Sequence, residues 1–75
     1  MTPDNFQRVL SRFLRRRPFR PFTLELFSGG RIEVNHLEAI RVFRNGLVEV
    51  RSTSHARSIF EVTEIVRFIT ETGTT

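Results

Sequence analysis

The sequence predicts an α+β domain in which an N-terminal amphipathic helix packs on a strongly bent antiparallel sheet of four or five strands. Apolar residues recur with helical spacing near the N-terminus, and from Phe22 onward they recur at every second residue. Breaks that contain glycine divide this second region into short runs. We expect one domain over 1–75, made of a helix at 1–17, a Pro-rich link at 18–21, a sheet at 22–70 and a frayed tail at 71–75.

The composition excludes several classes of protein. The chain has 75 residues, and its 39% apolar content, with eight Phe, is too high for a disordered segment. The absence of Cys excludes disulfides and thiolate metal sites. No run approaches the roughly 18 apolar residues of a membrane span, and no apolar core follows the N-terminal charges as in a secretory signal. We therefore expect a cytoplasmic protein with no membrane partner.

The positive charge is concentrated at the N-terminus. All twelve basic residues are Arg, and six of them lie in 1–20 against one acid, Asp4, which gives a net charge of +5. Residues 21–75 hold six Arg against seven Glu, a net charge of −1. Arg binds phosphate and carboxylate groups through paired hydrogen bonds, so this usage fits recognition of an anion. The simpler explanation is the codon usage of a GC-rich genome.

The predicted helix has a clear start and a clear end. Thr2 can cap it, Pro3 suits its first position, and Asp4 complements the positive end of the helix dipole. Pro18 lacks a backbone donor and disfavours helical geometry in the residue before it, so we expect the helix to end at 16–17. The apolar stripe consists of Phe6, Val9, Leu10, Phe13 and Leu14.

The first predicted hairpin turns at Ser28-Gly29-Gly30. A three-residue loop there, with Gly30 in the left-handed conformation, keeps apolar residues opposite one another, whereas a two-residue loop would oppose them to charges. The expected pairs are Leu26 with Ile32, Leu24 with Val34 and, on the outer face, Glu25 with Glu33. Because two Glu directly opposed repel each other, we expect an Arg nearby, either Arg31, Arg41 or one from another subunit.

The second predicted hairpin repeats this pattern at Arg44-Asn45-Gly46, with Gly46 in the left-handed conformation. The expected pairs are Val42 with Val48, Ile40 with Val50 and Arg41 with Glu49. Residues 36–39 should bend or cross over, and 52–55 should form a polar turn. A short strand is expected at 58–62. The segment 63–72 fits both a helix and a strand, and its β-branched residues favour the strand.

No pattern of catalytic residues is present. His36 and His55 are the only histidines, Asp4 is the only Asp, and none of them belongs to a nucleophile or metal-ligand motif. We therefore expect no enzyme activity, no metal, no cofactor and no small-molecule substrate.

The Arg-rich helix and link form the main candidate site. Arg residues along a helix can follow a phosphate backbone, and Phe19 can stack on a base. The candidate nucleic-acid-binding residues are Arg8, Arg12, Arg15, Arg16, Arg17, Arg20 and Phe19. The alternatives are a face that only confers solubility, which is the simplest explanation, or one that binds an anionic membrane surface or an acidic protein. The sharper hypothesis is a non-enzymatic module that binds RNA or DNA.

The rival hypothesis is a self-associating protein-interaction or assembly module, a homo-oligomer with no nucleic-acid role. The apolar alternation does not place Phe19 or Phe27 on the inward face, so these two are the candidate interface residues. The other Phe residues with an assigned phase point inward and are expected in the core. They are Phe6, Phe13, Phe22, Phe43 and Phe60.

The order of elements resembles the Sm-like small barrels, which are SH3-like in shape, and 22–69 is similar to the bacterial Sm-like RNA chaperones in spacing. The similar features are the strand that ends in Ser28-Gly29-Gly30-Arg31-Ile32, a long bent second strand, and the closing Val62-Thr63-Glu64-Ile65-Val66. The resemblance implies a small barrel. It does not carry over RNA-binding residues, because Val62-Thr63-Glu64 aligns with the family's Tyr-Lys-His segment and lacks its basic and aromatic groups. Pro18-Phe19-Arg20-Pro21-Phe22 is also similar to a segment of short uncharacterised bacterial proteins.

Overall fold

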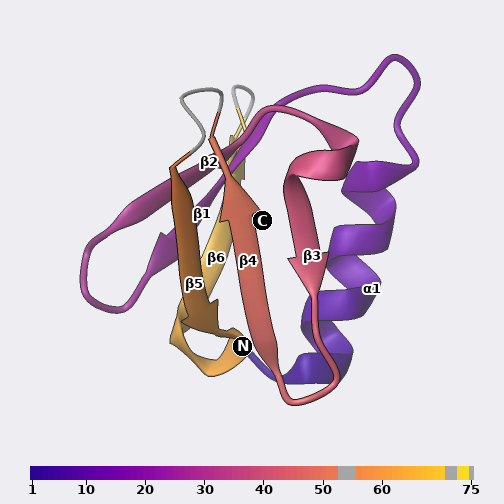
Figure 1. Ribbon diagram of the computed structural model, residues 1–75. Coiled ribbons are helices and arrows are strands. Elements are labelled where there is room, and N and C mark those ends of the chain that lie inside the picture. The colour runs from indigo at the N-terminus through magenta and orange to yellow at the C-terminus, as the bar shows by residue number, and fades with distance from the viewer. Residues whose placement is uncertain (53–55, 71–72, 75) are drawn as a thin grey trace.

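The computed structural model describes residues 1–52, 56–70 and 73–74, in which one helix is followed by strands in two antiparallel sheets (Figure 1). Helix α1 spans Pro3–Leu14, and short 3-10 turns lie at Leu37–Ala39 (η1) and Val62–Glu64 (η2). The strands are β1 (Phe22–Leu26), β2 (Arg31–Val34), β3 (Ile40–Val42), β4 (Leu47–Arg51), β5 (Arg57–Glu61), β6 (Ile65–Thr70) and β7 (Gly73–Thr74). The first sheet has the order β2-β1-β6-β7 and the second has the order β3-β4-β5.

Helix α1 begins where the sequence predicts and ends earlier. The hydroxyl of Thr2 accepts a hydrogen bond from the backbone N–H of Asn5 at 3.3 Å, which confirms Thr2 as the N-cap. The prediction of a helix to 16–17 is wrong, because Arg15 already has the C-cap position. The guanidinium of Arg17 donates to the carbonyl of Leu14 at 2.9 Å, which satisfies a carbonyl that a longer helix would have bonded internally.

The first hairpin has the expected loop size at a different position. The backbone N–H of Leu26 donates to the carbonyl of Gly30 at 2.8 Å, so the loop is 27–29 instead of 28–30. Gly29, and not Gly30, has the positive φ, 92°, that this loop requires. The predicted register is therefore wrong by two residues. The observed pairs are Phe22 with Val34, Thr23 with Glu33, Leu24 with Ile32 and Glu25 with Arg31.

Charge explains the choice between the two registers. Both keep apolar residues opposite apolar residues, but the observed one places Glu25 opposite Arg31 and Glu33 opposite Thr23. One oxygen of Glu25 lies 3.5 Å from Arg31 Nη2, and the other lies 2.7 Å from Nε of Arg67 in β6. The predicted opposition of the two Glu is therefore wrong, because the observed register replaces a repulsion with ion pairs on both sides. The expected Arg beside Glu25 is confirmed.

The second hairpin forms as predicted. Its pairs are Ile40 with Val50, Arg41 with Glu49 and Val42 with Val48. The backbone N–H of Phe43 donates to the carbonyl of Leu47 at 2.8 Å, which leaves 44–46 as the loop. Gly46 has a φ of 84°, so the prediction of its left-handed conformation is confirmed.

Gly46→Ala should lower the free energy of unfolding by about 1 kcal/mol, because a side chain is strained in the left-handed conformation. No atom lies within 4 Å of the position that a Cβ would take, so backbone strain alone should cause the loss. Gly30→Ala is the matched control, because its φ is not positive and its Cβ would meet Ser28 Oγ no closer than 3.4 Å. Urea denaturation measures both, and an equal loss in the two variants would contradict this account.

The last third of the chain is extended, which is the conformation that its β-branched residues favour. Strand β5 leads through η2 into β6, which pairs with β1 and is therefore a strand and not a helix. The prediction of a frayed tail is wrong at Gly73–Thr74, which pairs with the end of β6. The remainder of the tail and most of the predicted turn at 52–55 lie outside the described residues. The expected bend at 36–39 is confirmed as η1.

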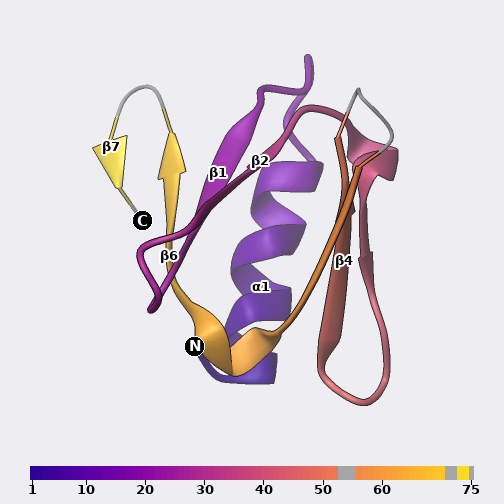
Figure 2. The same ribbon diagram turned by 60° about the vertical axis from the view of Figure 1, so that its left-hand side comes forward.

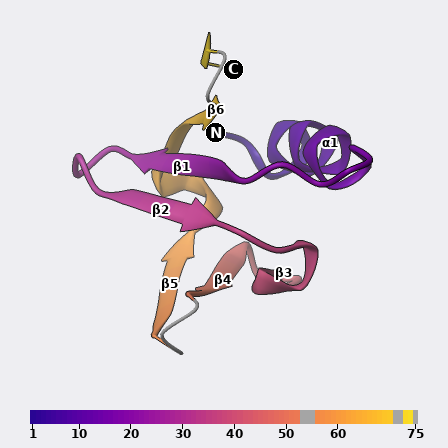
Figure 3. The ribbon, with the colours of Figure 1, turned by 90° about the horizontal axis from the view of Figure 1, so that it is seen from above.

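The apolar stripe of α1 packs against the first sheet through a cluster of Phe rings. The ring of Phe68 in β6 is stacked on Phe13 at 5.1 Å and lies 5.6 Å from both Phe6 and Phe22. The helix thereby covers the side on which the two sheets diverge (Figures 2 and 3). The core prediction is wrong for Phe43, which is 45% exposed because it lies beyond the end of β3.

Two sheets replace the single bent sheet that the sequence predicts. The chain passes from β2 to β3 through η1 and from β5 to β6 through η2. The backbone groups of these turns form hydrogen bonds within the turn; in η1 the N–H of Ala39 donates to the carbonyl of His36 at 3.1 Å. Because these groups do not bond to a neighbouring strand, the turns interrupt the strand pairing. Neither sheet in the described part of the chain closes on itself. The α+β architecture with a helix on antiparallel sheets is confirmed, and a small Sm- or SH3-like barrel is not.

Candidate nucleic-acid interface

The six Arg residues of the candidate site are all exposed, on α1 and on the chain that follows it. Arg8, Arg12 and Arg15 are four and three residues apart, so they share one side of the helix. The buried stripe lies elsewhere on its circumference. No acidic residue occurs in the sequence between Asp4 and Glu25, which leaves this stretch without a local counter-charge.

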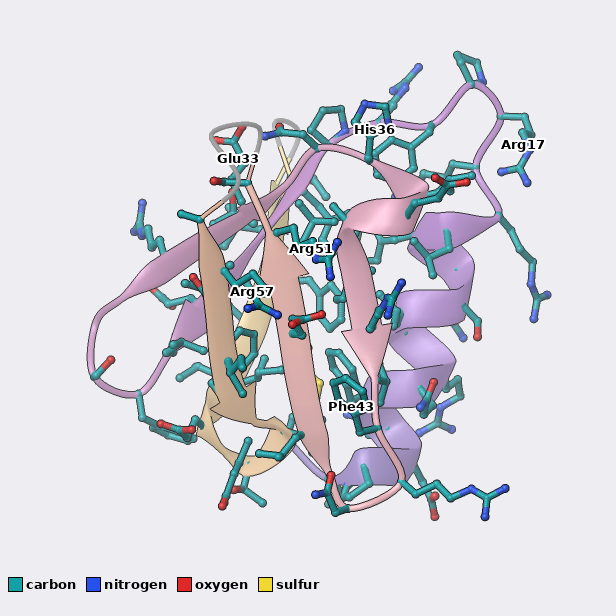
Figure 4. The ribbon with its side chains drawn as sticks, in the orientation of Figure 1. Arg17, Glu33, His36, Phe43, Arg51 and Arg57 are labelled. Atoms are coloured by element: carbon teal, nitrogen blue, oxygen red, sulfur yellow. The ribbon has the colours of Figure 1, made fainter. Side chains whose placement is uncertain are left out.

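Three of the six guanidinium groups already have a partner within the chain. Arg8 donates to the side-chain oxygen of Asn5 at 2.8 Å. Arg16 lies over the ring of Phe13, with its guanidinium carbon 4.5 Å from the ring centre, as a cation–π pair. Arg17 donates to two main-chain carbonyls at 2.9 Å each, although its side chain lies at the outer corner of the molecule (Figure 4). These contacts give the three residues a structural role.

The side chains of Arg12, Arg15 and Arg20 make no hydrogen bond or ion pair with any residue in 1–52, 56–70 or 73–74. Their guanidinium groups are therefore available to an external anion without the loss of an internal contact. The end of α1 also forms a shallow hollow of about 310 Å³. It is lined by Arg16, Arg17, Pro18 and Arg20.

The two candidate aromatic residues have different environments and do not share a patch. Phe19 is half-buried against the core, with its ring edge-on to Phe22 at 6.2 Å. Sequence reasoning gave Phe19 no inward contact, because its burial depends on the path of the link after α1. Phe27 is 72% exposed in the loop between β1 and β2. The two residues lie beyond opposite ends of β1, so the structure does not bring them together.

A second constellation lies on the outer face of β3-β4-β5, around Glu49. This carboxylate is only 5% exposed, although its strand face points outward. Its oxygens lie 3.8 Å from Arg51 Nε and 3.4 Å from Arg57 Nη1, and both side chains extend over β4 in Figure 4. Sequence reasoning found only Arg41 as the partner of Glu49. The alternation along β4 indicates Arg51, but Arg57 follows only from the β4–β5 register.

The described residues include no group of three or more His, Cys, Asp or Glu that could hold a metal ion. Glu33 lines a hollow of about 330 Å³ with Pro21, Phe22, Thr23, Ile69 and Thr70, and this hollow contains neither Glu25 nor His36. His36 is exposed beside η1, and His55 lies outside the described residues. None of the helices in the described part of the chain has the length and apolar character needed to cross a membrane.

Comparison with known proteins provides no assignment. The chain matches no family model, and no curated protein and no solved structure matches it. The function must therefore be argued from the geometry of these surfaces.

Proposed function

We propose that this protein is a non-enzymatic module that binds RNA or DNA through the Arg-rich face of α1 and the link after it. The observation that carries the proposal is the set of three exposed guanidinium groups without an internal partner, Arg12, Arg15 and Arg20. They lie in a stretch with no acidic residue. Arg side chains bind phosphate through paired, charge-assisted hydrogen bonds, and a nucleic-acid backbone presents phosphates in a row.

Binding of this kind depends on the nucleic-acid backbone and discriminates little between sequences. Arg8, Arg16 and Arg17 are held by contacts of their own, so they add positive potential and fewer direct contacts. The half-burial of Phe19 leaves only part of its ring for a base. The proposed module therefore binds single-stranded RNA and DNA with similar affinity.

The salt dependence of binding tests this proposal. If three guanidinium groups each neutralise one phosphate of a single strand, the logarithm of affinity should fall against the logarithm of salt concentration with a slope of about −2. Six contacts would give about −4. Fluorescence anisotropy with a short labelled RNA and a DNA of the same sequence measures the slope.

The matched variants are R12Q/R15Q and R41Q/R44Q. Each removes two exposed Arg whose side chains form no ion pair with the described part of the chain, one pair from the proposed face and the other from the second hairpin. R12Q/R15Q should reduce the slope by one to two units, and R41Q/R44Q should leave it unchanged. Absence of binding at low salt, or equal losses in the two variants, would refute the proposal.

We also propose that this fold is related to the Sm-like small barrels. The proposal is supported by chain order: β1 lies between β2 and β6, and the chain continues from β2 through η1 into the β3-β4-β5 sheet. We interpret the arrangement as an open form of that plan, in which η1 divides the bent second strand. This relation carries no residue role with it.

A further inference from the structure

Strand β5 is an open edge of the second sheet. Among the described residues, β5 pairs with β4 on one side and with no strand on the other. It contains no Pro and pairs without a bulge, and Pro and bulges are two of the features that protect an edge. At its centre, Ile59 is 60% exposed on the outer face. Beside it is an open hollow of about 560 Å³ that is lined in part by Phe43 and Leu47.

The hydrogen bonds at the two ends of the β4–β5 ladder determine which main-chain groups remain free. The N–H of Ser52 donates to the carbonyl of Ala56 at 2.9 Å, and the N–H of Val62 donates to the carbonyl of Gly46 at 2.8 Å. Hydrogen-bonded pairs alternate along an antiparallel ladder, so the even-numbered residues of β5 bond to β4. The residues that direct their N–H and C=O groups to the open edge are Arg57, Ile59 and Glu61.

This open edge is complementary to a second copy of itself. Antiparallel pairing about a two-fold axis at Ile59 places the two Ile59 side chains opposite each other. The same register places Arg57 opposite Glu61 of the second copy, on both sides of the axis. Within one chain, Arg57 is opposite Arg51, a pair of like charges. Glu61 of the second copy would give Arg57 an acidic neighbour on its other side.

We propose that this chain forms a two-fold dimer in which the β5 strands pair edge to edge and join two β3-β4-β5 sheets into one continuous sheet. Each Ile59 donates its N–H to the Ile59 carbonyl of the other copy. Each Arg57 N–H donates to the carbonyl of Glu61 of the other copy. The N–H of Glu61 already donates to the carboxylate of Glu64 at 2.7 Å and stays with it. Because the contact uses the same edge of both copies, it closes on itself and does not grow into a fibre.

The charge pattern identifies a second copy as the occupant instead of an unrelated strand. The edge offers one positive and one negative side chain on either side of an apolar one, and an antiparallel strand satisfies all three when it has the same pattern, as a second copy does. The contact is small compared with a standard interface, so the dissociation constant should be of the order of 10–100 µM.

Sedimentation velocity over a concentration series from about 5 to about 500 µM, which brackets that affinity, tests the dimer. The mass should rise from monomer toward dimer across the series. Ile59→Lys places two ammonium groups face to face at the axis and should weaken association at least tenfold. Phe27→Lys is the matched control, because Phe27 is also exposed but lies in the β1–β2 loop, and it should leave association unchanged. A chain that stays monomeric throughout, or that loses association only with Phe27→Lys, would overturn the proposal.

Charge exchange tests the register itself. Arg57→Glu and Glu61→Arg should each weaken the dimer, because each creates a like-charge pair across the axis. The double variant R57E/E61R restores opposite charges and should return the affinity to within a few-fold of the original. Arg57 also contacts Glu49, so circular dichroism should accompany each measurement. A folded double variant that associates no better than the single variants would refute this register, and Ile59→Lys tests the edge independently of Arg57.

Discussion

Phe68→Ala should lower the free energy of unfolding by about 3–5 kcal/mol. Phe68 is fully buried, and its ring is the common neighbour of Phe6, Phe13 and Phe22. Truncation removes the ring that joins α1 to β6 and β1, and in a small core the cavity can collapse only in part. A domain of this length has a total stability of roughly 4–11 kcal/mol, so the loss is a large fraction of the total.

Urea denaturation followed by circular dichroism measures this loss. Phe27→Ala is the control, since it removes the same atoms from a side chain that is 72% exposed and should cost less than about 0.5 kcal/mol. Phe68→Leu should lie between the two, because it fills much of the cavity. Similar losses for Phe68→Ala and Phe27→Ala would mean that the Phe cluster does not hold α1 on the sheet.

Glu49→Ala should lower the free energy of unfolding by about 2 kcal/mol. The carboxylate contacts Arg51 and Arg57 and is directly opposite Arg41, so its removal leaves three guanidinium groups close together without a counter-charge. Exposure of both contacting Arg side chains to solvent limits the loss to less than that of a fully buried ion pair.

Two measurements separate charge from packing at Glu49. If repulsion among the Arg residues causes the loss, the deficit should shrink at about 1 M salt, where charges are screened within about 3 Å. Arg57→Ala should then restore part of the stability in the Glu49→Ala background. Glu38→Ala removes an exposed Glu as a control and should have little effect. A deficit that neither salt nor Arg57→Ala changes would assign the role of Glu49 to packing alone.

The two hairpins show what can be predicted from local sequence and what cannot. The second contains a single glycine in its turn, so only one loop position is compatible with a left-handed residue, and the predicted register is confirmed. The first contains Gly29 and Gly30 in succession, and either can take that conformation. Its register depends on Arg31 and Arg67, and Arg67 belongs to a strand more than thirty residues away. The register of the first hairpin therefore depends on an ion pair with a distant strand, which the local sequence does not show.

The candidate site shows a similar division. Exposure of Arg8, Arg12, Arg15 and Arg16 follows from the helical spacing of the apolar stripe, and the structure agrees with it. The sequence does not reveal that Arg17 bonds to main-chain carbonyls or that Phe19 turns toward the core, because both depend on how the link leaves α1. The contact between Glu49 and Arg57 required the register of β4 with β5, and the polar composition of 52–55 does not specify that register.

The order β2-β1-β6-β7 makes the first sheet a long-range assembly and the second a local one. In the second sheet, the paired residues Val42 and Val48 are 6 positions apart in the sequence. In the first sheet, the paired residues Thr23 and Ile69 are 46 positions apart. Since the free energy of loop closure grows with the logarithm of loop length, bringing the second pair together costs about 2 kcal/mol more chain entropy. The chain-entropy cost of this fold is therefore concentrated in the pairing of β1 with β6. The Phe rings of α1 pack against these two strands, on Phe22 and Phe68.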